Sequence, residues 1–388
     1  MRILIPVLGF GRNGGYRVLS KLADQLLILG HDVEFLCSEG SEEPYFETNA
    51  EVNWVSEKGI TSLKSHHFTK DNALLIQQRL AKGLKLIGNQ FDIIFANHSL
   101  TLLPILRSGL LYKTLYYIQA YEPDYYKHLP GFKNKILYYI SLLSYNIKVF
   151  TIVNADIYSK YKNIRSRDVL YPGIDFQKFY PKNSLPENDK IILGTIGRTE
   201  AFKGTKQIIE AFTILKQQYS NLQLQVAYGD IELERIEGIK CIYPKNDTEL
   251  GSYYRDLDFY ISAQFSQPGA FHYPTAEAMA SGVAVITTLS YPANNENSWL
   301  IEPQNSKDIV KKFEGAHANK IARLEKTQQA LLDIRQFDWK TTGIKLEGLL
   351  KQLILKYTSD PKMITSQHLK NSKEPPLYNE YKPKEFPL

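Results

Sequence analysis

Short apolar runs alternate along the chain with longer segments in which apolar residues recur every three or four positions. The chain opens with an apolar run at 2–7, a segment of helical period at 16–29 and a second apolar run at 33–37. Short apolar runs are typical of buried strands, and the longer period is typical of amphipathic helices. A strand, a helix and a strand in this order predict a βαβ unit and therefore a parallel sheet.

The same order of elements returns in the second half of the chain. Apolar runs at 191–196, 222–227 and 239–243 accompany helical patterns at 207–218 and 249–257. Residues 171–190 between the halves are rich in proline, glycine and polar residues, as expected for a domain boundary. A chain of 388 residues is also too long for one ordinary core. We predict an α/β protein with domains at 1–180 and 181–340, a helix at 341–357 and an extended or disordered tail at 358–388.

The stretch 256–288 combines two strands, a loop and a helix in a way that suits a nucleotide. Its pattern predicts strands at 259–263 and 283–287 around a helix at 274–280. Pro274 fits the first helical turn, and Gly282 is a natural helix end. The N-terminus of such a helix binds anions through its free backbone N–H groups. Glu277 lies one turn inside, so we expect phosphate at the helix start and ribose hydroxyls at this carboxylate.

A glycine-rich loop follows the first strand. Gly9, Gly11 and Gly14 form the pattern G-x-G-x-x-G, which is the dinucleotide-binding fingerprint, and Glu39 follows the second strand. Three interpretations stay open: an NAD-type dehydrogenase, glycines that only make a tight turn, and a loop whose Gly14 and Gly15 amides approach a diphosphate. We favour the third, because no later segment supplies a nicotinamide site.

A second loop, at 197–204, follows the first strand of the second half. It carries Arg198 and Lys203, and both residue types are common partners of phosphate. Open parallel sheets bind ligands at the carboxyl ends of their strands, which is where this loop lies. The alternative is that both side chains are ordinary solvated surface charges.

Composition and charge narrow the class of protein. The net charge of +6 is mild and evenly spread, so it suits an acidic small ligand or an anionic membrane rather than a nucleic acid. Cys37 and Cys241 are predicted to be buried free thiols in a reducing compartment, and no metal-binding spacing is visible. The start of the chain does not have the pattern of a signal peptide. Residues 136–153 are predicted to be a buried helix and a strand rather than a membrane span.

Several motifs in combination resemble the GT-B glycosyltransferases of family 4. They are GR-x4-KG at 197–204, PTAEAMASGVAVITT at 274–288, the opening GG-x-RVLSKLADQLLILGHDVEF, YPGIDFQKFYP near the domain boundary and FDWKTTGIKLEGLL near the end. The resemblance covers nearly the whole chain to about residue 355. It implies two Rossmann-like domains facing across a cleft, with the last helix crossing back onto the first domain. It also implies a nucleotide-diphosphate sugar held mainly by the second domain.

The resemblance assigns donor-binding roles residue by residue. Arg198 and Lys203 would hold the diphosphate, and Glu277 would accept hydrogen bonds from the ribose. The nucleotide-sugar-binding set that it implies is Gly14, Gly15, Arg198, Lys203, Tyr243, Lys245, Tyr273, Pro274, Thr275 and Glu277. Among these, Gly15 would let the first domain approach the diphosphate, and Tyr243 and Lys245 would lie near the base.

Two departures from the family pattern point to a subgroup. The family has a pair of glutamates eight residues apart, and Gly269 stands at the first of these positions. Gln119 and Ala120 replace the usual His-Asp after a strand of the first domain. Both changes resemble bacterial polysaccharide rhamnosyltransferases with a Q-x-Y-E-P segment, matched here by Gln119, Tyr121, Glu122 and Pro123. The resemblance therefore implies dTDP-L-rhamnose as donor, with Gln119 and Tyr121 in an acceptor loop.

These departures leave the catalyst open. A carboxylate could deprotonate an acceptor hydroxyl as a general base, and Glu122 and Asp124 are the candidates, with Glu122 favoured. The alternative for Glu122 is that it caps or orients its loop. His98 is read as a loop histidine rather than a base. Arg198, Lys203 and helix N-termini would neutralise the departing diphosphate, so we expect no cofactor and no metal ion.

The acceptor side contains many tyrosines between 121 and 145, together with Lys127, His128, Lys133 and Lys135. This composition suits a membrane interface, sugar stacking or a packed surface. We predict a cytoplasmic hexosyltransferase that extends a growing or lipid-linked surface polysaccharide, such as a capsule or O-antigen, and contacts the inner membrane peripherally. The alternatives are a GT-B sugar-nucleotide epimerase and a degenerate, non-catalytic binding subunit.

Overall fold

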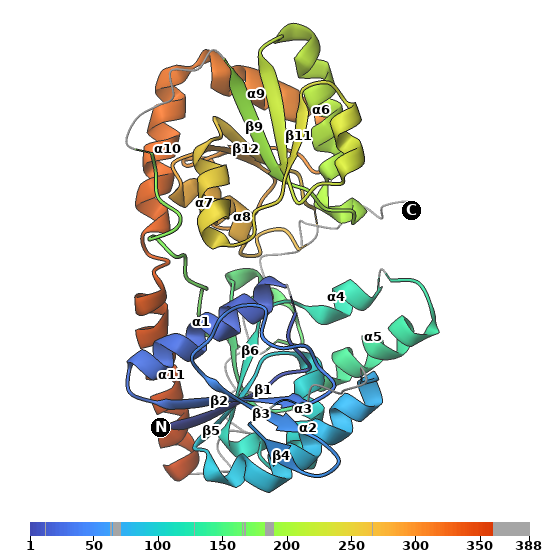
Figure 1. Ribbon diagram of the computed structural model, residues 1–388. Helices are drawn as coiled ribbons and strands as arrows, with labels where there is room; N and C mark the ends of the chain where they lie inside the picture. The colour runs from blue at the N-terminus through green and yellow to red at the C-terminus, as the bar shows by residue number, and fades with distance from the viewer. Residues whose placement is uncertain are drawn as a thin grey trace. The chain divides into compact units, whose positions relative to one another are not determined.

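The computed structural model describes residues 1–11, 13–62, 64, 71–127, 129–164, 166, 168–182, 190–265 and 267–359 (Figure 1). The chain forms two compact units: Met1–Pro172 with Trp339–Leu388, and Gly173–Asp338. The first unit therefore gives way to the second after Pro172, before the predicted boundary at residue 180. The reason is that Ile174 donates its N–H to the carbonyl of Phe337 at 2.6 Å, which ties the segment after Pro172 to the second unit. The predicted tail lies, from residue 360 on, outside the described residues.

The first unit is built on a sheet with the strand order β4-β3-β2-β1-β5-β6-β7-β8. Neighbouring strands are parallel, except for the pair β3 and β4. This confirms the parallel sheet predicted from the opening pattern. The strands are β1 (Arg2–Pro6), β2 (Asp32–Ser38), β3 (Glu51–Val55), β4 (Ile60–Thr61), β5 (Ile93–Ala96), β6 (Thr114–Ile118), β7 (Phe150–Val153) and β8 (Asp168–Val169).

The helices of the first unit are α1 (Gly14–Ile28), α2 (Ala73–Ile87), α3 (Leu102–Arg107), α4 (Glu122–Lys127), α5 (Phe132–Ser144) and α11 (Trp339–Ser359). The prediction for 136–153 is confirmed, since α5 and β7 occupy this segment. No helix among the described residues has both the length and the apolar character needed to cross a bilayer. The last helix, α11, packs against α1, and His31 Nε2 lies 3.0 Å from Glu347 Oε1.

The second unit has a fully parallel sheet in the order β11-β10-β9-β12-β13-β14. Its strands are β9 (Ile191–Ile196), β10 (Leu222–Ala227), β11 (Ile239–Ile242), β12 (Phe259–Ser262), β13 (Ala284–Thr287) and β14 (Trp299–Leu300). Its helices are α6 (Thr205–Gln218), α7 (Asp247–Arg255), α8 (Tyr273–Ala280), α9 (Ser306–Ala318) and α10 (Lys320–Ile334).

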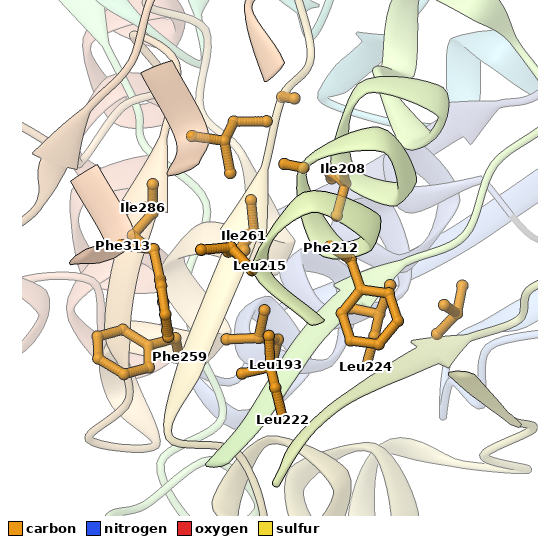
Figure 2. Close-up of a cluster of buried hydrophobic side chains, with 14 of the residues drawn as sticks. Leu193, Ile208, Phe212, Leu215, Leu222, Leu224, Phe259, Ile261, Ile286 and Phe313 are labelled. Carbon is orange, nitrogen blue, oxygen red and sulfur yellow. The ribbon is translucent and has the colours of Figure 1, made fainter. Parts of the chain in front are cut away.

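One hydrophobic cluster fixes the central strands of the second unit against α6 and α9 (Figure 2). Phe212 and Leu215 on α6 pack with strand residues such as Leu193, Leu224 and Phe259, and all of them are nearly inaccessible to solvent. Burial of each such side chain stabilises the fold by about 1.5–3 kcal/mol. The cluster therefore anchors β9 and β12 in the second unit, and polar loops follow these two strands.

Candidate functional site

The strand order of the second sheet reverses between β9 and β12, so the loops after these two strands diverge to opposite faces. Open α/β sheets bind ligands at such a switch point. The two loops are joined there, because Phe265 donates its N–H to the carbonyl of Phe202 at 3.0 Å. Gly204, with φ +74°, makes this approach possible, since a Cβ at this residue would lie 2.3 Å from the carbonyl oxygen of Ala263.

Arg198, Lys203 and His272 form a cluster of basic side chains at this switch point, which we call the cation cluster. Lys203 Nζ donates to Oε1 of the buried Gln264 at 3.2 Å, and Gln264 Nε2 donates to Ser290 Oγ at 3.3 Å. Burial, and then the charge of Arg198, lower the pKa of Lys203. Neither Arg198 nor Lys203 forms an ion pair with a carboxylate of the described residues. Cations that disfavour each other's charge and lack a counter-ion favour an anionic ligand.

His272 stands at the N-cap of α8 and joins the cation cluster to this helix. Its Nδ1 lies 2.8 Å from Thr275 Oγ1, which fixes the orientation of the ring. Burial, followed by the charges of Lys203 and Arg198, holds the pKa of His272 well below its usual value. The predicted helix at 274–280 is confirmed and begins one residue earlier, at Tyr273. The positive end of the α8 dipole therefore reinforces the cation cluster.

Glu277 lies inside the second unit, on α8, with 2% of its surface exposed. Its Oε2 accepts a hydrogen bond from the hydroxyl of Tyr254 on α7 at 3.1 Å. Burial, and then the Glu277 charge, raise the pKa of Tyr254 well above its usual value, which keeps this hydroxyl a donor. The carboxylate thus ties α8 to α7, and its predicted contact with ribose stays a prediction.

Two exposed tyrosines end neighbouring strands at the edge of the same sheet. The register pairs Ala227 of β10 with Ile242 of β11, so Tyr228 and Tyr243 follow as neighbours. The hydroxyl of Tyr243 donates to the carbonyl of Gly229 at 2.9 Å, while half of the residue (51%) remains exposed. A ring tethered at its hydroxyl offers a flat apolar surface for a base. Lys245 is exposed beside it.

In the first unit, the predicted catalytic residues lie at the start of α4, directly after β6. Glu122 is 7% exposed. Its Oε1 accepts the backbone N–H of Ser99 at 3.2 Å, and its Oε2 accepts a short hydrogen bond from the hydroxyl of Tyr145. Asp124 accepts a hydrogen bond from Tyr161 at 2.8 Å. We call Glu122, Asp124 and these donors the carboxylate cluster.

His98 belongs to the edge of the carboxylate cluster. Its Nε2 lies 3.8 Å from Glu122 Oε1, and its Nδ1 accepts the backbone N–H of Leu100 at 3.0 Å. Because Nδ1 is an acceptor, the proton of the neutral ring must be on Nε2, which faces Glu122. A ring in this tautomer has no free nitrogen lone pair, so this geometry agrees with the interpretation of His98 as a loop residue.

Gly14 and Gly15 open α1, and Gln119 follows β6. A Cβ at Gly15 would lie 3.5 Å from Gln119 Oε1, so the structure brings this glycine and the glutamine together. This oxygen is buried without a hydrogen-bond partner among the described residues. Tyr121 accepts a hydrogen bond from Asn163 at 2.8 Å and stacks on Tyr161, which places it beside Asp124.

The structure adds residues that sequence reasoning missed: His272, Gln264 and Tyr228. Only His272 had a signal, because it occupies the N-cap position directly before a helix that begins with Tyr-Pro. Within the described parts of the chain, no three His, Cys, Asp or Glu side chains gather as a metal site would require.

The sequence of this chain is similar to those of known glycosyltransferases. Residues 190–319 match the family described as "Glycosyl transferases group 1". The chain is 22% identical over 326 residues to an "Uncharacterized glycosyltransferase" of Haemophilus influenzae, covering 79% of this chain and 87% of that protein. It is 26% identical over 164 residues to the "Capsular polysaccharide biosynthesis glycosyltransferase CapM" of Staphylococcus aureus, covering 37% of this chain and 42% of that protein.

Solved structures show the same fold. The sucrose-phosphate synthase of Thermosynechococcus elongatus matches with a TM-score of 0.73 at 15% identity, covering 92% of this chain and all (100%) of that one. HepE of Anabaena, in complex with UDP and glucose, matches with a TM-score of 0.67 at 15% identity, covering 91% of this chain and 100% of that one.

The two parallel sheets and these neighbours define the GT-B fold, as predicted. The match of residues 190–319 and the named relatives add the activity: the protein is an enzyme, a glycosyltransferase. These findings favour the transferase over a dehydrogenase, an epimerase or a non-catalytic subunit.

Proposed function

We propose that the protein transfers a sugar from a nucleotide-diphosphate sugar to a hydroxyl of a growing or lipid-linked surface polysaccharide. The observation that carries the donor half is the cation cluster at the start of α8, whose Arg198 and Lys203 form no ion pair with a described carboxylate. Two relatives support it: HepE was crystallised with UDP and glucose, and CapM is named for capsular polysaccharide biosynthesis.

The cation cluster would bind the diphosphate of the donor. Arg198 is exposed and can swing onto the phosphates, whereas Lys203 is held in place by Gln264. Backbone groups around Tyr273, Pro274 and Thr275 would meet the phosphate or the sugar, because free N–H groups gather at a helix N-terminus. The same cations would neutralise the charge that develops on the diphosphate as it leaves, so we propose chemistry without a cofactor.

The nucleoside would extend from the cation cluster toward the tyrosines that follow β10 and β11. Tyr243 would stack on the base, and the exposed Lys245 would add a contact with phosphate or base. Glu277 would accept hydrogen bonds from the ribose hydroxyls through its carboxylate, whose Oε2 is also bonded by Tyr254. The first unit would contribute Gly14 and Gly15, whose amides open α1.

For the sugar, we propose L-rhamnose donated by dTDP-L-rhamnose. Support comes from the resemblance of the Gln119, Tyr121, Glu122 and Pro123 segment to bacterial rhamnosyltransferases, and from Gly269 in place of the usual glutamate. Gln119 has a buried amide oxygen without a partner among the described residues, so it is ready to accept a hydrogen bond from a substrate hydroxyl.

In the transfer step, a carboxylate would take the proton of the acceptor hydroxyl while this oxygen bonds to the anomeric carbon of the donor. The bond from that carbon to the phosphate oxygen breaks, and the nucleoside diphosphate leaves with the electron pair. Glu122 is our first candidate for the base because its orientation is fixed by Ser99 and Tyr145. Asp124 is the second candidate: it is more exposed than Glu122 and therefore easier for an acceptor to reach.

A panel of dTDP-, UDP- and GDP-sugars tests the proposed function. Thermal shifts report donor binding, since a ligand stabilises the fold according to its occupancy, and release of the nucleoside diphosphate reports turnover. We expect stabilisation by one nucleotide series, greatest for dTDP-L-rhamnose, and release when a polysaccharide acceptor is added. Absence of binding and release with every donor would contradict the proposal.

We also propose that the enzyme acts in the cytoplasm at the inner face of the membrane, where a lipid-linked acceptor would be exposed. The structural support is the set of exposed apolar side chains on α5.

A further inference from the structure

Helix α5 turns its apolar side chains outward. Phe132, Ile136, Tyr139 and Leu143 follow one another at spacings of four, three and four, so they lie on one face of the helix. We call these four residues the α5 stripe. Their exposed fractions are 78%, 43%, 62% and 66%. A helix that rests on a soluble core normally buries such a face.

The buried positions of α5 are occupied by serines instead. Ser141 and Ser144 are its buried residues, and both hydroxyls bond to carbonyls of their own helix, at 2.9 and 2.6 Å. Helix α6 shows the usual arrangement, since its buried residues are Ile208, Ala211, Phe212 and Leu215. Leu137, Ile140 and Leu142 of α5 are partly buried, so the helix also has apolar residues away from the stripe. The α5 stripe is therefore apolar surface in excess of what the helix needs to pack on the first unit.

The charged side chains of the segment that contains α5 have one sign, and the carboxylates just before it, Glu122 and Asp124, are buried and half-buried. Residues 125–148 contain Lys127, Lys133, Lys135 and Lys148 and have neither aspartate nor glutamate in their sequence. All four lysines are exposed, and we call them the lysine rim. Helix α4 packs against α5 (Figure 1). Tyr125 on α4 adds an exposed aromatic ring. Apolar and aromatic side chains next to lysines are typical of helices that lie in the surface of an anionic bilayer.

Another helix shows that exposed apolar residues alone do not produce this pattern. On α10, Ile321, Leu324 and Leu332 are also exposed, by 72%, 59% and 56%. Glu325 and Asp333 stand directly after two of them. Lys320, Arg323 and Lys326 lie on the same helix, so the charges of α10 are mixed in sign, whereas those of residues 125–148 are all positive. The carboxylates would be repelled by anionic lipids, so α10 serves as the comparison helix for α5.

We propose that α5 docks on an anionic lipid bilayer, with the α5 stripe among the upper acyl chains and the lysine rim at the phosphate level. Charge complementarity selects lipid over a second copy of the chain, because two copies would bring eight like charges together through the paired lysine rims. The docking helix is also connected to the carboxylate cluster: Tyr145, which ends α5, donates its hydroxyl to Glu122. A bilayer bound at α5 would thus present lipid-linked acceptors close to the candidate base, a consequence that rests on the proposed function, whereas docking does not.

The test is flotation of the full chain with vesicles of phosphatidylcholine alone and of phosphatidylcholine mixed with phosphatidylglycerol. We expect binding to the mixed vesicles only, weakened by added salt because the Debye length falls. Leu143→Glu on the α5 stripe and Lys133→Glu in the lysine rim should each reduce the bound fraction at least about tenfold. The matched control, Leu324→Glu on α10, should float like the wild type.

Thermal unfolding and nucleotide thermal shifts of the same variants separate docking from folding and from donor binding. All substituted positions are exposed, so we expect unchanged melting and unchanged nucleotide shifts. Equal flotation of the wild type and Leu143→Glu would overturn the proposal. Failure of the wild type to bind the mixed, anionic vesicles would also overturn it. A wild-type dimer that Leu143→Glu converts to a monomer, without lipid binding, would show that the α5 stripe is a protein interface instead. None of these outcomes depends on turnover.

Discussion

The carboxyl ends of the two sheets carry opposite charge, although the strands beneath them are arranged alike. Six strands of the first unit follow the order β3-β2-β1-β5-β6-β7, and the second unit repeats it as β11-β10-β9-β12-β13-β14. At the ends of these strands, the second unit gathers the cation cluster and the first unit the carboxylate cluster. The chemistry of each unit therefore resides in its loops.

The two clusters also differ in how their charges are satisfied. Glu122 and Asp124 each accept hydrogen bonds from tyrosine hydroxyls, and Glu122 also accepts a backbone N–H. Arg198 and Lys203 form no ion pair with a described carboxylate, although the charge of Glu200 acts on Lys203 at longer range. A cluster without counter-ions is prepared for a charged ligand, whereas a satisfied cluster is prepared to hold groups in position. This contrast supports donor binding on one unit and acceptor activation on the other.

The largest expected effect comes from the carboxylate cluster. Glu122→Gln keeps the size of the side chain and its acceptor oxygen but removes the charge, so we expect kcat to fall by about 10²–10⁴-fold, the contribution of a general base. Asp124→Asn is the matched control and should cost much less. The pH dependence of kcat should lose its acid limb only in Glu122→Gln. Full activity of this variant would remove Glu122 as the base, and a larger loss in Asp124→Asn would transfer the role.

The next effect tests the backbone that supports the cation cluster. Gly204→Ala places a Cβ 2.3 Å from the carbonyl oxygen of Ala263 at a residue with φ +74°. We expect the free energy of unfolding to fall by about 1–3 kcal/mol in denaturant titrations. Gly315→Ala on α9 is the control, because a Cβ there meets no atom within 4 Å. Equal stability of Gly204→Ala and wild type would contradict the close approach of the two loops.

The smallest effect concerns the pH dependence that His272 introduces. Its pKa lies well below the usual 6.5 in the folded protein, so the unfolded chain takes up this proton first as the pH falls. Stability should therefore decrease below about pH 6.5, by at most about 1.4 kcal/mol per pH unit, until the pH reaches the lowered pKa. His272→Gln should remove this decrease in the free energy of unfolding. Denaturant titrations at about pH 5 to 7, the range around the usual pKa of histidine, would measure it. An unchanged curve would show that the ring titrates normally.

Much of the fold and of the cation cluster could be predicted from the sequence, and the features that were missed have physical reasons. The strands around α8 were predicted to within one residue because buried apolar runs bounded by Gly and Pro are a local signal. Helices α3 and α4 were not predicted, since six residues are too few to show a helical period. Arg198 and Lys203 were found through their motif, but Gln264 becomes visible only when the loops after β9 and β12 meet.

The carboxylate cluster shows the same limit more strongly. Glu122 was singled out through the resemblance of its segment to the Q-x-Y-E-P pattern. Its partners Ser99 and Tyr145 are each 23 residues away and come from other elements. The exposure of the α5 stripe also required the structure, because the sequence shows an apolar helix with serines but does not show which face the protein buries.

Isothermal titration of the purified protein with dTDP, UDP and GDP tests the central claim most directly, namely that the cation cluster binds the diphosphate of the donor. Lys203→Met removes a charge within the cluster, and Lys206→Met removes one from a lysine whose side chain is 83% exposed on α6. We predict that one nucleoside diphosphate binds the wild type and Lys206→Met equally and binds Lys203→Met at least about tenfold more weakly, the loss of one charge-assisted hydrogen bond. Equal affinity of Lys203→Met and wild type, or no binding of any of the three nucleotides, would contradict the claim.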